Sequence, residues 1–146
     1  MDEQQRKILL AFDRAGIREL ALADFGDSAT PGVISGMIER GWLRAGAAVG
    51  TYFRTEDGRL QLAGPLDVTI YSRPGCHLCE EAKIQIAPLL QELGGRLTEI
   101  NIDEDAQLRA RYDYDVPVIF LGARMAAKHR VNLGQFRRQM HDASHS

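Results

Sequence analysis

The sequence predicts a mixed α/β protein that is built in two parts. Residues 66–141 alternate short apolar runs with amphipathic segments, which is the pattern of strands that alternate with helices. Residues 1–63 differ, because helical segments come first and strand-like segments follow. Between the two parts, Ala63-Gly64-Pro65 is a short breaker sequence. We therefore expect one domain over residues 1–63 and a second over residues 66–141.

The first domain is expected to contain three helices followed by strands. Its helices are predicted over residues 4–14, 17–23 and 30–40. The third helix has a clear start at Thr30-Pro31, where a capping hydroxyl precedes a proline in the first turn. Strands are expected over residues 42–44 and 51–62. Within the second of these segments, Asp57-Gly58 is a typical hairpin turn sequence.

The second domain is expected to have the element order β-α-β-α-β-β-α. The strands are predicted over residues 67–72, 96–102, 116–121 and 124–128. The helices are predicted from residue 76 to Gly94-Gly95, over residues 104–112, and after residue 132. Asp103 and Asn132 are the expected caps of the last two helices, because their side-chain oxygens can accept hydrogen bonds from backbone N–H groups.

Composition and charge define the broad class of the protein. The chain has 146 residues, of which 45% are hydrophobic and 26% are charged, as in soluble globular proteins. A formal net charge of −2 gives no bulk attraction to nucleic acid or to an acidic membrane. The first six residues are too acidic and polar for a signal peptide, and no apolar run approaches the ~20 residues that span a bilayer. We therefore expect a cytoplasmic protein without membrane contact.

The chemistry of the sequence is concentrated in Cys76-His77-Leu78-Cys79, which holds the only two cysteines. They follow a predicted strand and stand at the start of a predicted helix. A helix N-terminus has unpaired N–H groups and a partial positive charge, which favour a thiolate over a thiol. A spacing of three residues brings the second sulfur close enough to form a disulfide. C-x-x-C beside a β–α unit therefore indicates a dithiol redox site.

Two other interpretations of the pair are half of a zinc site and two inert thiols. Zinc needs about four ligands, usually with a second ligand cluster at a suitable spacing. His77 and His129 are the only histidines before the C-terminal tail, and they do not provide that cluster. We therefore expect no bound metal and no bound cofactor. In a cytoplasmic protein, two isolated cysteines are more often catalytic than structural.

The second domain resembles the glutaredoxin-like family of the thioredoxin fold. The matching segments are Val68–Ala82 around the cysteine pair, Asn101–Asp105 and Tyr112–Val118, in that order. The resemblance implies a thioredoxin-like fold, and a thiol–disulfide oxidoreductase that reduces or exchanges substrate disulfides.

The two cysteines are expected to have different roles. Cys76 is the expected nucleophile, with a lowered pKa, and Cys79 would resolve the mixed disulfide. Arg73 lies three residues before Cys76 and is expected to add positive potential. Glu80 has two opposing effects, because an acid in the first turn suits the helix dipole but opposes a thiolate. The sequence leaves that balance open, and it also leaves open whether His77 has a role.

The resemblance implies a second part of the site at Val116-Pro117. In thioredoxin-fold proteins a cis-proline lies opposite the cysteine pair, and the preceding residue offers its backbone N–H and C=O to the substrate. Here that preceding residue is Val116, and we expect the Val116–Pro117 bond to be cis. Tyr71 and Arg73 complete the residues that we expect to bind substrate.

Two departures from the family pattern concern glutathione. Members that use glutathione usually have Thr-Val-Pro, whereas this chain has Asp115-Val116-Pro117. They also have a Gly-Gly pair further on, whereas this chain has only Gly122. The expected substrate is a disulfide-containing protein or a glutathione mixed disulfide. Glutathione and a thioredoxin-type reductase are the alternative electron donors, and we expect weak glutathione binding.

The first domain loosely resembles a winged-helix domain, through Ile38–Leu43 and Tyr52–Gly58. This resemblance introduces a second hypothesis, a redox-responsive DNA-binding regulator with the cysteine pair as its switch. Residues 1–64 carry 8 basic and 9 acidic side chains, a net charge of −1, which is unfavourable for phosphate binding. We therefore favour protein contact or dimerisation for this domain. A non-catalytic thioredoxin-like adaptor is the third hypothesis.

Overall fold

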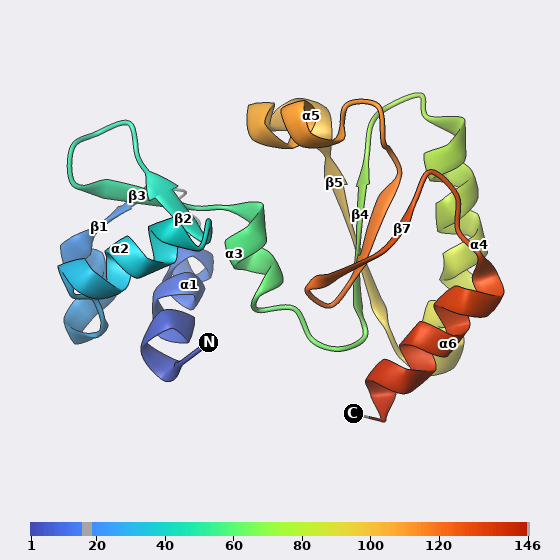
Figure 1. Ribbon diagram of the computed structural model, residues 1–146, viewed down its shortest axis with the longest axis horizontal. Helices are drawn as coiled ribbons and strands as arrows, with labels where there is room; N and C mark the ends of the chain where they lie inside the picture. The colour runs from blue at the N-terminus through green and yellow to red at the C-terminus, as the bar shows by residue number, and fades with distance from the viewer. Residues whose placement is uncertain (16–18, 146) are drawn as a thin grey trace. The chain divides into compact units, whose positions relative to one another are not determined.

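The computed structural model describes residues 1–15 and 19–145, which form two compact units (Figure 1). The first unit spans Met1–Leu62 and the second Ala63–Ser146. Each unit has its own cluster of buried apolar side chains.

The first unit combines helices with a small antiparallel sheet. Its elements are α1 (Glu3–Ala15), β1 (Glu19–Ala21), the 3₁₀ segment η1 (Leu22–Ser28), α2 (Pro31–Glu39), β2 (Leu43–Ala45), β3 (Thr51–Arg54) and α3 (Glu56–Leu60). The strand order is β1-β3-β2. The core includes Ile8 and Phe12 of α1, Met37 of α2 and Leu43 of β2. The resemblance of this unit to a winged-helix domain stays a prediction.

The helix predicted over residues 17–23 is wrong where the structure describes it. Residues 19–21 form strand β1, which pairs with β3, and residues 17 and 18 lie outside the described part of the chain. The strand is held by a long-range contact, since the Glu19 carboxylate accepts hydrogen bonds from the Ala48 N–H and the Thr51 hydroxyl. A partner 29 residues away in the sequence leaves no local signal.

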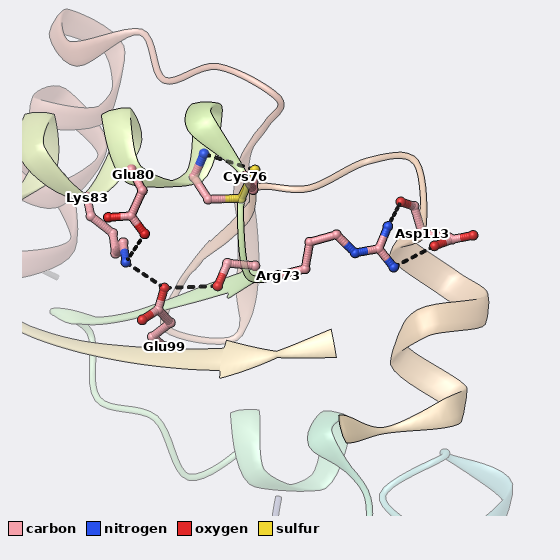
Figure 2. Close-up of a disulfide and its surroundings, with 8 residues drawn as sticks. Arg73, Cys76, Glu80, Lys83, Glu99 and Asp113 are labelled. Carbon is pink, nitrogen blue, oxygen red and sulfur yellow. Dashed lines mark hydrogen bonds and ion pairs between the residues drawn. A yellow bond between two sulfur atoms is a disulfide. The ribbon is translucent and has the colours of Figure 1, made fainter. Parts of the chain in front are cut away.

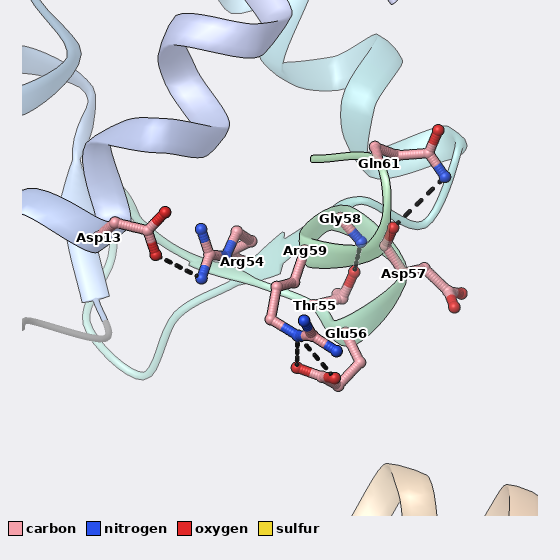
Figure 3. Close-up of polar contacts among 8 residues, drawn as sticks. All are labelled: Asp13, Arg54, Thr55, Glu56, Asp57, Gly58, Arg59 and Gln61. Carbon is pink, nitrogen blue, oxygen red and sulfur yellow. Dashed lines mark hydrogen bonds and ion pairs between the residues drawn. The ribbon is translucent and has the colours of Figure 1, made fainter. Parts of the chain in front are cut away.

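The hairpin turn predicted at Asp57-Gly58 is also wrong, because both residues lie in helix α3 (Figure 3). Thr55 caps this helix, and its hydroxyl oxygen accepts a hydrogen bond from the Gly58 N–H at 3.0 Å. The Thr55 N–H in turn donates to the Trp42 carbonyl oxygen at 3.0 Å. This anchoring to the segment before β2 favours a helical turn, and strand β3 ends at Arg54.

The second unit has the predicted order β-α-β-α-β-β-α, with one additional 3₁₀ turn. Its elements are β4 (Asp67–Ser72), α4 (His77–Leu93), β5 (Arg96–Asn101), η2 (Ile102–Glu104), α5 (Ala106–Tyr112), β6 (Val118–Leu121), β7 (Arg124–Lys128) and α6 (Leu133–Ser144). The sheet order is β5-β4-β6-β7. Strand β5 runs parallel to β4, whereas β6 and β7 pair antiparallel with their neighbours.

Helices cover both faces of this sheet, with α4 and α6 beside each other on one side and α5 on the opposite side (Figure 1). Ile70 of β4 packs in a core with Ile86 of α4 and Phe136 of α6. The next residue, Tyr71, points to the other face, because side chains alternate along a strand. There its ring lies 5.2 Å from the ring of Tyr112, at the end of α5. Strand β4 is therefore buried on both faces.

The two predicted helix caps have different outcomes. Asn132 caps α6 as predicted, and its side-chain oxygen accepts a hydrogen bond from the Gln135 N–H at 3.0 Å. The cap predicted at Asp103 is wrong, because the chain first makes the turn η2 and α5 begins later. Asp105 caps α5 and accepts from the Gln107 N–H at 2.9 Å. The Asp103 carboxylate pairs with Arg73 instead.

A glycine-to-alanine pair tests the packing of α3. A Cβ atom at Gly58 would overlap the Trp42 carbonyl oxygen, whereas a Cβ at Gly36 in α2 meets nothing within 4 Å. We expect Gly58→Ala to lower the free energy of unfolding by about 1–3 kcal/mol, because backbone atoms must shift. Gly36→Ala is the matched control and is expected to be neutral, or stabilising by about 0.5–1 kcal/mol. Urea unfolding followed by the fluorescence of Trp42, the only tryptophan, measures both. Equal stability of the two variants would contradict this packing.

Candidate functional site

The cysteine pair lies where strand β4 passes into helix α4. The strand ends at Ser72, and the loop Arg73–Gly75 turns the chain toward the helix. Gly75 has a φ of 77°, a left-handed conformation that favours glycine. Cys76 is the N-cap residue of α4. The central strand and the glycine turn thus place both cysteines at the start of a long helix.

Cys76 and Cys79 are joined by a disulfide, with their Cα atoms 5.3 Å apart. The Cys79 N–H donates a hydrogen bond to the Cys76 Sγ at 3.1 Å. The Cys76 sulfur thus occupies the position at which a capping oxygen usually accepts from the helix. When the disulfide is reduced, this donor and the helix dipole favour negative charge on the Cys76 sulfur.

The two sulfurs differ in accessibility. Cys79 is 1% exposed, whereas Cys76 is only partly buried. Cys76 is therefore the more accessible of the two sulfurs. This asymmetry fits the predicted roles of nucleophile and resolving thiol.

The Val116–Pro117 peptide bond is cis, as predicted. Val118 pairs with Tyr71 in the sheet, so Val116-Pro117 lies at the end of β6 that borders the cysteine loop. Pro117 is buried, and its carbonyl oxygen accepts a hydrogen bond from the His129 N–H at 2.8 Å. Within the described residues, the backbone N–H and C=O of Val116 have no hydrogen-bond partner.

The structure places Tyr71, which was expected to bind substrate, in the core, and its role in substrate binding stays a prediction. Its side chain is 1% exposed and lies in the core, with the Tyr112 ring at 5.2 Å and the Phe120 ring at 5.6 Å. The sequence places Tyr71 only five residues before Cys76, but the alternation of the strand turns it into the packing between β4 and α5.

Arg73 points away from Cys76 and toward Asp113 (Figure 2). Its guanidinium donates to the carboxylates of Asp113 at 2.7 Å and Asp103 at 2.8 Å, and to the Asp113 carbonyl oxygen at 3.0 Å. The hydrogen bond to Asp103, and then that to Asp113, raise the pKa of Arg73 above its ordinary value. The positive potential expected from Arg73 is therefore balanced by two carboxylates.

A second ion-pair network, which the sequence analysis did not identify, lies beside the cysteine pair (Figure 2). The Lys83 ammonium lies 2.7 Å from a Glu80 oxygen and 2.8 Å from a Glu99 oxygen. The Ser72 hydroxyl donates to Glu99 at 2.9 Å. Hydrogen bonds to Glu80 and then Glu99 raise the pKa of Lys83, and Lys83 lowers the pKa of Glu99. Glu80 and Lys83 are three residues apart on a helix, so their contact could be predicted from the sequence. Glu99 lies on strand β5, and its contact with Lys83 depends on how the sheet packs against α4.

A small hollow lies beside the cysteine pair, between α4 and the segment that follows β7. It is lined by Leu78, Glu81, Ala82, Gln85, His129, Arg130 and Val131. Leu78 stands between the two cysteines, so the hollow borders the site. Nearby, the Asp115 carboxylate lies 3.5 Å from the His129 imidazole and 3.7 Å from the ammonium group of Lys128, the last residue of β7.

The described part of the chain contains no group of three or more His, Cys, Asp or Glu side chains that could hold a metal ion. In the same residues, the helices are too short or too polar to cross a membrane.

A four-stranded sheet with this order, a cysteine pair at the start of α4 and a cis-proline before β6 define a thioredoxin-like protein of the dithiol class. Residues 67–141 match the family described as "Glutaredoxin-like domain (DUF836)". The chain belongs to this glutaredoxin-like family. The "Glutaredoxin-like protein YDR286C homolog" of Dictyostelium discoideum is 34% identical over 73 residues, which are 46% of this chain and 68% of the relative.

The solved structures to which the chain is similar include the following three. The target protein XcR50 from X. campestris is 28% identical and has a TM-score of 0.40, over 51% of this chain and 96% of that one. The holo form of glutaredoxin C1 from Populus tremula x tremuloides is 20% identical, with a TM-score of 0.41 over 60% and 94%. Oxidised thioredoxin from Plasmodium falciparum is 9% identical, with a TM-score of 0.41 over 60% and 88%. The glutaredoxin-like family and the close cysteine pair fit a thiol oxidoreductase.

The unequal accessibility of the sulfurs makes a direct prediction. In the reduced protein at mildly acidic pH, limited iodoacetamide should alkylate Cys76 first, because Cys76 is accessible and accepts the Cys79 N–H. Fragment-ion mass spectrometry locates the label on either cysteine. The same reaction in urea is the control, where both thiols should react at similar rates. Preferential labelling of Cys79 in the folded protein would contradict the assignment.

Proposed function

We propose that this protein is a thiol–disulfide oxidoreductase that reduces or exchanges the disulfides of its substrates through Cys76 and Cys79. One observation carries the proposal. A disulfide links the partly buried N-cap sulfur of α4 to a buried sulfur one turn later, and the helix backbone donates a hydrogen bond to the first. Such a pair can alternate between disulfide and dithiol without a change of fold.

The reaction has two exchange steps. The Cys76 thiolate attacks one sulfur of the substrate disulfide, a mixed disulfide forms, and the other substrate sulfur leaves as a thiolate that takes up a proton. Cys79 then loses its proton and attacks the Cys76 Sγ, which releases the second substrate thiol and forms the Cys76–Cys79 disulfide. Two electrons pass from the dithiol to the substrate. A thiol or a dithiol reductase as electron donor then restores the reduced pair.

The backbone of Val116 supports binding of an extended substrate. Its N–H and C=O have no partner within the described residues, and Val116 precedes the strand that pairs with β4. A substrate segment in extended conformation can form backbone hydrogen bonds there, as an added strand does at a sheet edge. A protein disulfide provides such a segment on both sides of its cysteine.

The charges near the pair support a low affinity for glutathione. Arg73 is already paired with two carboxylates, and Asp115 stands directly before Val116. Glutathione carries two carboxylates, so it finds no unbalanced cation at Arg73. At Asp115 it meets a like charge, whose basic neighbours Lys128 and His129 lie 3.7 and 3.5 Å away. We therefore propose a protein disulfide as substrate and a thioredoxin-type reductase as the preferred electron donor.

Turnover assays test the proposed reaction. The protein should reduce insulin disulfides with a thioredoxin reductase and NADPH as donor, and more slowly with glutathione as donor. Cys76→Ser should abolish turnover, because no mixed disulfide can form. Cys79→Ser should accumulate a mixed disulfide at Cys76 that mass spectrometry detects. Absence of turnover with both donors, or an active Cys76→Ser variant, would contradict the proposal.

A charge-only substitution tests the glutathione argument. Asp115→Asn should raise kcat/KM with glutathione as donor by about fivefold, because one repelling charge near the ligand costs about 1 kcal/mol. Glu92→Gln is the matched control. Glu92 pairs with Arg137 and lies near the C-terminal end of α4, whereas the cysteines lie at its N-terminal end. If the parent protein turns over efficiently with glutathione and Asp115→Asn leaves that kcat/KM unchanged, repulsion of glutathione by Asp115 is refuted.

A further inference from the structure

The cysteine pair lies between two ion clusters of the same make-up. Lys83 lies between the carboxylates of Glu80 and Glu99, at 2.7 and 2.8 Å. On the other side of Cys76 in Figure 2, the Arg73 guanidinium points toward Asp113. It lies 2.7 Å from the Asp113 carboxylate and 2.8 Å from the Asp103 carboxylate. Each cluster holds one cation and two anions, so each has a net charge of −1 when all its groups are ionised.

Lys83 occupies a fixed position relative to the thiols. It follows Cys79 by four residues, so the two side chains share one face of α4. Its side chain is 23% exposed, against 66% for Glu80, and its ammonium reaches across to Glu99 of β5. Glu99 also accepts the hydroxyl of Ser72, the last residue of β4 before the cysteine loop. The cation is thus the most enclosed charge of its cluster.

We propose that Lys83 is a positioning residue for the cysteine chemistry, because its ammonium offsets Glu80 and Glu99 and so keeps the Cys76 thiolate accessible near neutral pH. This inference rests on the proposed function. Nearby negative charge disfavours a thiolate, and nearby positive charge favours it. Loss of the ammonium changes the cluster from −1 to −2 beside Cys76. Loss of the Glu80 charge changes it from −1 to zero.

The directions of the pKa shifts agree with an ion pair between Lys83 and Glu99. Hydrogen bonds to Glu80 and then to Glu99 raise the pKa of Lys83, and the hydrogen bond from Lys83 lowers the pKa of Glu99. The other charged groups around the pair in the described residues include His77 and Glu81 of α4, the Arg73 cluster, Asp115 with Lys128 and His129, and Arg130 of the hollow. These groups stay the same in every variant below, so differences report on the Lys83 cluster.

Four variants distinguish an electrostatic role of Lys83 from a purely structural role, in which its ion pairs only hold α4 against β5. The measured quantity is the pH profile of Cys76 alkylation by iodoacetamide, an uncharged probe, in a Cys79→Ser background. Lys83→Gln should slow alkylation near neutral pH by about threefold or more, and Glu80→Gln should accelerate it by a similar factor. The double variant Lys83→Gln/Glu80→Gln should return to the parent rate, because its cluster again has a net charge of −1. Lys83→Arg should also keep the parent rate.

A purely structural role predicts a different pattern. Lys83→Gln and Glu80→Gln would then shift the pH profile of alkylation in the same direction, and the double variant would be the most affected. That pattern, or four unchanged profiles, would overturn the inference. Glu80→Gln keeps the test decisive even if Lys83→Gln folds poorly, since Glu80 is largely exposed. Arg137→Gln, on α6, is the remote control for a lost cation. Alkylation does not depend on turnover, so absent reductase activity would refute the proposed function separately.

Discussion

The hydrogen bond from the Cys79 N–H to the Cys76 sulfur is the interaction on which the site depends. It exists because Cys76 is the N-cap of α4, and that position is set by the packing of the second unit. Strand β4 is buried on both faces, and Ile70 holds it against α4 and α6. The start of the helix is therefore fixed by core packing, and the Cys79 N–H is directed at the Cys76 sulfur.

Charge around the pair is arranged so that neither nearby cation acts alone. Arg73 and Lys83 are each held between two carboxylates, on opposite sides of Cys76 in Figure 2. The sequence left open whether Glu80 would oppose a thiolate at Cys76. The structure turns its carboxylate toward Lys83, which balances much of that charge at short range. The helix N-terminus is then the main source of positive potential at the sulfur.

Much of the second unit could be predicted because its signals are local. The order of its strands and helices follows from apolar periodicity, and the cap at Asn132 follows from a single side chain beside the backbone it serves. The cysteine pair and the cis bond before Pro117 belong to short motifs. Local signals fail where two turns compete within a few residues, as at Asp103, where a 3₁₀ turn comes first and Asp105 becomes the cap.

The sequence by itself determined which residues are the candidates for the chemistry, because two cysteines at the start of a helix need no distant partner to be recognised. Only the tertiary structure decided their surroundings. Tyr71 became a core residue through contacts with Tyr112 and Phe120, and Lys83 met Glu99 across the edge of the sheet. In the first unit, Glu19 formed a strand through a partner 29 residues away. Such pairings depend on how separate elements pack, and no local pattern encodes them.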